Sequence, residues 1–305
     1  MAARTTVTLE ELMLLQADAR GFSLQSRQPA GSLLAGRHAS RLRGRGLTFE
    51  ELRQYHQGDD IRTMDWKATA RLRSPQVRVY AEERERPVLL VVDQRQTMYF
   101  GSRRAMKSVA AAEVAALGAW RAIKGGDRVG GLVFNEHEIV EVRPHRSRTR
   151  VMQLLSAVQR LNCQLAEPPA SGDVTLDGVL RRAAQVAKHD HLVVLISDLD
   201  GAGDETKRLA SQLAAHNDVL VAAVYDPLGA SLTGSPGMLA ADRGQSWEVA
   251  GGASFAREFW DTFQQRLDEW REVFRALRVP LLPISTARPV VDQVREMFGG
   301  RGSTA

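Results

Sequence analysis

The segment that most constrains the fold is an apolar run, Val88 to Val92, that ends at Asp93. An uninterrupted run of valine and leucine is typical of a strand that is buried on both faces of a parallel sheet. Open α/β sheets bind their ligands at the carboxyl ends of such strands. Asp93 is therefore a candidate site residue, and Thr97 extends the site into a polar loop that has Arg95 at its centre.

After this strand the sequence alternates between strand and helix patterns. Further strands are predicted at residues 128–134, 191–197, 219–225 and 279–284, and helices at 104–123, 147–161, 176–187, 205–216, 255–277 and 289–298. Residues 138–143 are expected to pair back on the strand at 128–134, and residues 247–249 to form part of a short hairpin. The alternation predicts an α/β fold, a doubly wound and mostly parallel sheet with helices on both faces.

The N-terminal part has a different character. Helices are predicted at residues 8–19 and, from a capping-box pattern, at 48–57, with a loop at 21–46 and a strand at 76–82. The fold is thus expected to carry an N-terminal helical and loop extension. We predict a segment at residues 1–85 and an α/β domain at residues 86–299.

Composition narrows the functional classes. The chain has 305 residues and one cysteine, Cys163, and it shows neither a signal pattern nor an apolar stretch long enough to cross a membrane. These features favour a cytoplasmic protein without disulfides. The net charge is +5, with a basic cluster formed by Arg37, Arg41, Arg43 and Arg45. No aromatic residue for base stacking lies within this cluster, so we favour a solvated loop over a nucleic-acid site.

Polar residues follow several of the predicted elements at one edge of the sheet. Besides Asp93 and Thr97, Thr175 precedes a helix and Asp198 follows the strand at 191–197. Two carboxylates and two hydroxyls suit Mg²⁺. Arg95 opposes a metal ion, because its charge at 4 Å from a dication would cost about 8 kcal/mol at an effective dielectric constant of 20. Two interpretations follow: a degenerate Mg²⁺ site, or a hydrogen-bonded cluster without a cofactor, in which Arg95 acts as an internal cation.

A second dense block of polar residues lies between positions 53 and 71. It contains Arg53, Tyr55, Gly58, Asp59, Asp60, Arg62, Asp65, Trp66 and Arg71. With His56, the aspartates could form a second metal site. We favour a structural network in which Asp59 and Asp60 cap a turn and pair with arginines, while Trp66 anchors the segment on the domain.

These residues carry a resemblance to known families. The pattern of Asp93, Thr97, Thr175 and Asp198 resembles the metal-ion-dependent adhesion site of von Willebrand factor A (vWA) domains, with Arg95 in place of a serine. The block at 53–71 resembles the signature of the DUF58 family, bacterial proteins with a vWA-like domain, and the resemblance covers about residues 36–290. It implies a non-enzymatic interaction module that is a partner or adaptor of a MoxR-type AAA+ ATPase, with other vWA proteins as further partners.

Two alternative functions remain open. The loop from Asp93 to Thr97 also resembles a degenerate haloacid-dehalogenase loop, in which Asp93 would be the nucleophile and Asp198, Asp200 and Asp204 would bind Mg²⁺. Arg95 replaces the acid–base residue of that loop, so we expect no enzymatic activity. Binding of nucleic acid by the basic cluster would show an affinity that falls steeply with salt.

Overall fold

The computed structural model describes residues 3–19, 47–56, 59–82, 86–167, 172–227, 239–242, 245–248, 265, 268–277 and 279–298. The chain divides into two compact units. Residues 1–26 and 86–305 form the first, here called the α/β unit, and residues 27–85 form the second, here called the hairpin unit. Each unit is described by itself.

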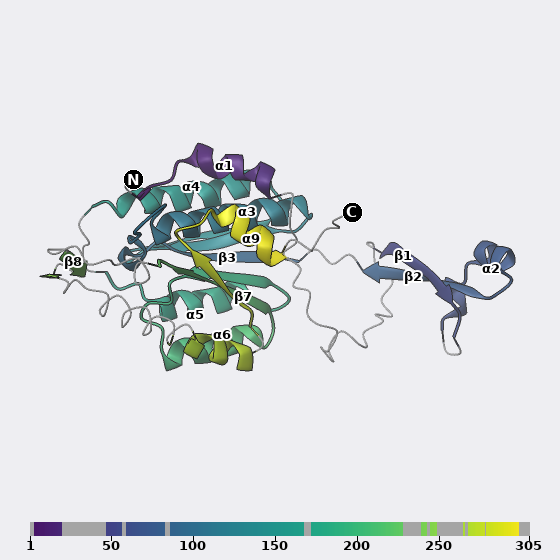
Figure 1. Cartoon of the computed structure of the whole chain (residues 1–305). Helices are drawn as coiled ribbons and strands as arrows, with labels where there is room; N and C mark the ends of the chain where they lie inside the picture. The colour runs from purple at the N-terminus through teal and green to yellow at the C-terminus, as the bar shows by residue number, and fades with distance from the viewer. Residues whose placement is uncertain are drawn as a thin grey trace. The chain divides into compact units, whose positions relative to one another are not determined.

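A six-stranded sheet forms the centre of the α/β unit (Figure 1). The strands are β3 (Val88–Asp93), β4 (Val129–Phe134), β5 (Ile139–His145), β6 (Leu192–Ser197), β7 (Asp218–Tyr225) and β10 (Leu281–Ser285). Their order is β10-β7-β6-β3-β4-β5, and all neighbours in this sheet are parallel except β5, which pairs antiparallel with β4. The predicted α/β fold with a doubly wound, mostly parallel sheet is therefore confirmed.

The strand order places a topological switch point beside β3. The chain runs from β3 to β4 on one side and later returns to β6 on the other side. In open α/β sheets the crossovers leave in opposite directions at such a point and open a crevice at the carboxyl ends of the strands. Asp93 ends β3 and Asp198 directly follows β6, so the sheet brings the two predicted acids to this position.

Helices cover both faces of the sheet (Figure 1). One face carries α3 (Lys107–Lys124), α4 (Arg148–Gln164) and α9 (Val290–Phe298), with α1 (Leu9–Asp18) packed against α3 and α4. The other face carries α5 (Leu176–Val186), α6 (Asp204–Ala214) and the helical residues 268–276. Five of these helices and α1 match the predicted helices within a few residues at each end, and the helical residues 268–276 agree with the end of the helix predicted at 255–277, whose first residues lie outside the described ones.

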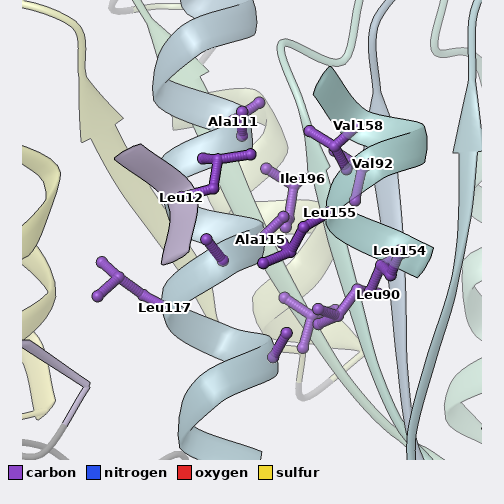
Figure 2. Close-up of a cluster of buried hydrophobic side chains, with 14 of the residues drawn as sticks. Leu12, Leu90, Val92, Ala111, Ala115, Leu117, Leu154, Leu155, Val158 and Ile196 are labelled. Carbon is purple, nitrogen blue, oxygen red and sulfur yellow. The ribbon is translucent and has the colours of Figure 1, made fainter. Parts of the chain in front are cut away.

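Strand β3 shows why both faces are apolar. Leu90 and Val92 point into the core beneath α3 and α4, whereas Leu89 and Val91 point into the core beneath α5 and α6. All four side chains are fully buried. Figure 2 shows the first of these cores, in which Leu90 and Val92 meet the alanines of α3 and the leucines of α4. The uninterrupted apolar run follows from this burial on two sides.

Helix α1 completes the core of the α/β unit. Leu12 is fully buried in that core (Figure 2), and its carbonyl accepts a hydrogen bond of 2.9 Å from Trp120 Nε1. The N-terminal chain also forms a β-bridge between Arg4 and Ala105. Our predicted division at residue 85 set this helix apart from the α/β domain. The structure instead groups it with that domain, because its apolar face supplies part of the core.

The hairpin unit consists of β1 (Leu47–Gln54), a 3₁₀ turn η1 (Ile61–Thr63), α2 (Trp66–Leu72) and β2 (Gln76–Glu82). The helix predicted at residues 48–57 is wrong, because residues 47–54 pair antiparallel with β2. The backbone partner on β2 outweighs the local capping-box signal, which is a common cause of error in sequence-based assignment. The strand predicted at residues 76–82 is confirmed.

The remaining predictions have mixed outcomes. The hairpin at residues 138–143 is confirmed as β5, and the short hairpin near Trp247 corresponds to β8 (Leu239–Asp242) and β9 (Gln245–Glu248). The loop at 21–46, its basic cluster and Gly58 lie outside the described residues, as does residue 249. Within the described part of the chain, no helix has the length and apolarity that crossing a membrane requires.

Candidate functional site at the carboxyl edge of the sheet

Asp93 lies at the centre of the site. It is the last residue of β3, and none of its surface is exposed. Ser197 Oγ, from the end of β6, donates to Asp93 Oδ2 at 2.6 Å, and the backbone N–H of Arg95 donates to Oδ1 at 3.0 Å. Sequence reasoning missed Ser197. The parallel pairing of β3 with β6 explains its position, since Val92 pairs with Ile196 and the next residues on the two strands are Asp93 and Ser197.

The guanidinium of Arg95 folds back onto Asp93. Arg95 Nε lies 3.0 Å from Asp93 Oδ1, and Nη2 lies 2.7 Å from Oδ2, which makes the pair bidentate. Nη2 also donates to the carbonyl of Asp200 at 3.1 Å and lies 4.0 Å from Asp198 Oδ1. The guanidinium carbon is 5.6 Å from the centroid of the Phe134 ring. Arg95 is only 8% exposed, so this charge lies inside the protein.

Asp198 has its own cation. Lys107, the first residue of α3, places Nζ 2.6 Å from Asp198 Oδ2, while the backbone N–H of Asp200 donates to Oδ1 at 3.0 Å. Burial raises the pKa of Asp198, but Lys107, the Asp200 N–H and Arg95 outweigh burial, so the pKa lies below its usual value. Burial alone would lower the pKa of Arg95, but Asp93 first, then Asp198 and Asp200, raise it. Sequence reasoning missed Lys107.

The turn after β6 holds these groups in place. Leu199 has a φ of 60° and Gly201 a φ of 73°, both in the left-handed region. A left-handed leucine is uncommon, and the hydrogen bond from Leu199 N to Ser197 Oγ, 3.0 Å long, helps to fix it. The turn thereby directs the carbonyl of Asp200 toward Arg95.

The two predicted hydroxyl ligands have other surroundings. Thr175 is the N-cap of α5, and its Oγ1 accepts from Gly178 N at 3.1 Å. Thr97 lies in the 3₁₀ turn η2 (Gln96–Met98), and its Oγ1 is buried without a hydrogen-bond partner among the described residues. In that same part of the chain, no hydrogen bond joins either threonine to Asp93 or Asp198. The structure thus brings the two acids and Arg95 together but does not join the threonines to them.

These side chains do not fit a divalent cation. Two carboxylates face two cationic side chains, so the charges balance without a metal ion, and both carboxylates already accept short hydrogen bonds. A dication about 4 Å from either cation would be opposed by about 8 kcal/mol at an effective dielectric constant of 20. The described residues also contain no group of three or more His, Cys, Asp or Glu side chains that could hold a metal ion. The unpartnered Thr97 hydroxyl alone does not offset this mismatch.

A short loop beside the site exposes an aromatic ring. Phe100 is 41% exposed, and Lys107 Nζ lies 6.0 Å from its ring centroid. Gly101 packs so closely on the carbonyl of Ala105 that a Cβ atom at this position would collide with it. Ser102 N donates to Asp226 Oδ2 at 2.9 Å, which ties the loop to the end of β7. Phe100 is therefore held at the rim of the site.

The block at residues 53–71 forms a network inside the hairpin unit. Arg53 makes a bidentate contact with Asp59 at 2.9 and 2.7 Å, and this contact, with a hydrogen bond from His56 N, lowers the pKa of Asp59 to about 2. Asp60 caps η1 through Arg62 N at 3.0 Å. Asp65 pairs with Arg78, which the sequence analysis did not single out.

Trp66 lies at the start of α2 and is 67% exposed within the hairpin unit. Its predicted role as the anchor of this segment on the α/β domain stays a prediction. Tyr55 contributes through its backbone N–H, which donates to the carbonyl of Pro75 at 2.9 Å. Arg71 is exposed on α2.

The fold and the site together define an α/β protein with a doubly wound sheet whose carboxyl edge carries one buried cation, Arg95, and one half-buried cation, Lys107. The chain belongs to the DUF58 family, whose model, described as a protein of unknown function, matches residues 51–269.

Similar proteins include uncharacterized protein Rv1480 of Mycobacterium tuberculosis and uncharacterized protein Mb1516 of Mycobacterium bovis. Each is 30% identical over 213 residues, which cover 70% of this chain and 66% of the relative. The match thus spans slightly less than two thirds of the relatives' length.

Two solved structures are similar at lower identity. The conserved hypothetical protein BatB from Bacteroides thetaiotaomicron is 12% identical, with a TM-score of 0.43 over 69% of this chain and 97% of that one. The SpRpn10 VWA domain is 13% identical, with a TM-score of 0.40 over 73% of this chain and 100% of that domain.

Proposed function

We propose that this DUF58 protein is a non-enzymatic protein-interaction module that docks a partner at the carboxyl edge of its sheet without a metal ion. The observation that carries the proposal is the pairing of Asp93 with Arg95 and of Asp198 with Lys107. An adhesion-type site needs a cation between its carboxylates and its partner. Here, two side chains of the protein supply the positive charge, so the edge is ready for docking at any metal concentration.

The rim of the site supports docking. Phe100 offers an exposed apolar contact beside the charged cluster, and the loop that carries it is held by the hydrogen bond from Ser102 N to Asp226. Aromatic residues are enriched at protein interfaces, and a fixed backbone reduces the entropy cost of binding. An aromatic residue held beside a desolvated charge cluster is a suitable anchor for a protein partner.

We further propose that the partner is a MoxR-type AAA+ ATPase. The support for this partner is membership of the DUF58 family, together with the resemblance of the site to vWA interaction domains. Other vWA proteins are candidates for a larger assembly with the same ATPase. We propose no cofactor, since the side chains at the site already balance their charges.

A capture experiment tests the proposal. The full chain is immobilised and offered the purified MoxR-type ATPase of the same organism, in Mg²⁺ and in EDTA. We expect equal capture in both conditions. Phe100→Ser should weaken capture at least about tenfold, as expected when a hot spot is lost. The matched control is Leu14→Ser, which removes a side chain that is 68% exposed on α1.

Three outcomes would count against the proposal. Loss of capture in EDTA would show that a metal ion mediates binding. No capture in either condition would remove the ATPase as the partner. An equal effect of Phe100→Ser and Leu14→Ser would remove this edge as the surface.

The geometry gives no support to the phosphatase alternative. A nucleophilic aspartate must reach its substrate, whereas Asp93 is fully buried and both of its oxygens accept hydrogen bonds. Of the predicted magnesium ligands, Asp204 instead forms an exposed ion pair of 2.8 Å with Lys207. Hydrolysis of a generic phosphate ester that disappears in Asp93→Asn would revive this alternative. The nucleic-acid alternative concerns residues 37–45, which lie outside the described residues.

A further inference from the structure

We propose that the exposed face of α2 is a second docking surface, which binds an acidic protein segment and seats an apolar side chain of that segment on Trp66. The surface, here called the α2 face, consists of Trp66, Lys67, Ala70 and Arg71. It lies in the hairpin unit and does not depend on the site at Asp93.

Helical spacing brings these four side chains together. Trp66 and Ala70 are four residues apart, as are Lys67 and Arg71, so each pair is adjacent on the helix surface. All four residues are exposed, and 67% of the surface of Trp66 is accessible. Ala70 adds no bulk beside the indole. The result is a flat apolar spot with a row of cations next to it.

The opposite side of α2 is tied to β2. Thr69 Oγ1 accepts a hydrogen bond of 2.9 Å from Gln76 N, and Ala68 and Thr69 are half-buried. Asp65 caps the helix by accepting from Lys67 N at 3.0 Å and Ala68 N at 2.9 Å. A helix of seven residues would not be stable by itself in water. These contacts hold it in one orientation, so the α2 face is preorganised for binding.

The charges of the surrounding segment favour an acidic partner. Asp60 and Asp65 are occupied with capping η1 and α2, and Asp65 also pairs with Arg78 at 2.8 Å. Lys67 and Arg71 on the face, and Arg62 and Arg73 beside it, are exposed, and none of the four forms an ion pair within the described ranges. A positive surface attracts and orients a negative one. Tryptophan and arginine are also the residues that most often dominate binding energy at protein interfaces.

Other classes of partner fit this surface less well. Sequence-tolerant binding of single-stranded nucleic acid uses a row of aromatic side chains, whereas the α2 face has one. Helices that lie in a membrane interface need a long apolar side, whereas α2 has seven residues with a single large apolar side chain on this face. A protein segment needs only one anchor and neighbouring opposite charges, and the α2 face provides both.

The test uses the full chain and a labelled peptide of alternating glutamate and leucine as the probe, with fluorescence anisotropy as the readout. A lysine–leucine peptide, single-stranded DNA and phosphatidylserine vesicles are offered in parallel. We expect binding of the acidic peptide alone, weakened at least about tenfold by Trp66→Ala and by Lys67→Glu combined with Arg71→Glu. The control Leu52→Ala, on β1 of the same unit, should bind within about twofold of wild type.

Several results would overturn the proposal. They are absence of acidic-peptide binding, equal binding by Trp66→Ala and wild type, and stronger binding to DNA or vesicles. A dimer in sedimentation that Trp66→Ala dissociates would also overturn it, because the occupant would then be a second copy of the chain. Circular dichroism of each variant confirms folding. None of these results bears on capture at the sheet edge, so the two proposals can fail separately.

Discussion

Replacing Arg95 tests whether its charge is the internal cation of the site. Arg95→Met keeps most of the side-chain volume but leaves Asp93 with only the Ser197 hydroxyl and one backbone N–H as partners. Removing one member of a buried ion pair costs about 3–5 kcal/mol, because the other charge remains buried and uncompensated. For a domain of this size each kcal/mol lowers the melting temperature by about 2–4 °C, so the expected drop is about 6–20 °C.

The measurement is urea unfolding followed by circular dichroism, with calorimetry for the melting temperature. The matched control is Arg143→Met, whose side chain is 85% exposed and lies 3.4 Å from Glu141. It should change the free energy of unfolding by less than about 1 kcal/mol.

A double variant provides the decisive comparison. Asp93→Asn combined with Arg95→Met removes both charges, so no unpaired charge stays buried. We expect this variant to be more stable than Arg95→Met alone, although still less stable than wild type because hydrogen bonds are lost. The reasoning fails if Arg95→Met lies within about 1 kcal/mol of wild type, or if the double variant is the less stable of the two.

Three further predictions follow from the same contacts. Arg95→Ser with Lys107→Met removes both cations, and Mg²⁺ at about a hundred times its dissociation constant should then stabilise the protein by about 2.7 kcal/mol, whereas neither Mg²⁺ nor EDTA shifts the wild-type melting temperature. The lowered pKa of Asp198 means that wild type loses stability as the pH falls below 3.8, because the unfolded chain then binds a proton that the folded carboxylate does not. Lys107→Met should weaken this dependence in urea titrations across pH. Asn162→Ala leaves the Val7 N–H and Gln94 Oε1 without the buried hydrogen-bond partner that Asn162 provides, so unfolding should become easier by about 2–3 kcal/mol, and hydrogen exchange at Val7 should speed up.

The sheet could be predicted from the sequence because its signals are local. The apolar run of β3 must be buried on two sides, and the buried strands β3 and β6 are each followed by a helix, so their parallel order follows from few assumptions. The convergence of Asp93 and Asp198 follows from the same rule. Both residues are placed by backbone topology, which a sequence pattern describes well.

The errors arose where a distant partner decides the structure. Residues 48–51 look like a helix start, yet this segment pairs with β2, 28 to 33 residues further along the chain. Helix α1 looks like part of an extension, yet Leu12 packs against α3. In both cases the local pattern is compatible with more than one outcome, and a non-local contact selects between them.

Arg95 shows most clearly what a sequence pattern cannot determine, which is the direction of a long side chain. The sequence identifies a cation at a ligand position, but a long side chain can point either to solvent or back onto Asp93. The choice depends on Ser197, Phe134 and the Asp200 carbonyl, which belong to other strands and turns. Lys107 was missed for the same reason, since nothing near it in sequence indicates that it meets Asp198.

The permanence of these cations has a consequence for the proposed function. A metal-dependent site can be emptied, so its docking follows the concentration of the ion. Arg95 cannot leave, and because Asp93 raises the pKa of Arg95, a rise in pH does not discharge it either. Docking at the sheet edge would therefore be constitutive, and its control would have to come from another surface. The α2 face suits that role, because its exposed charges are screened by salt and can be masked by an acidic segment.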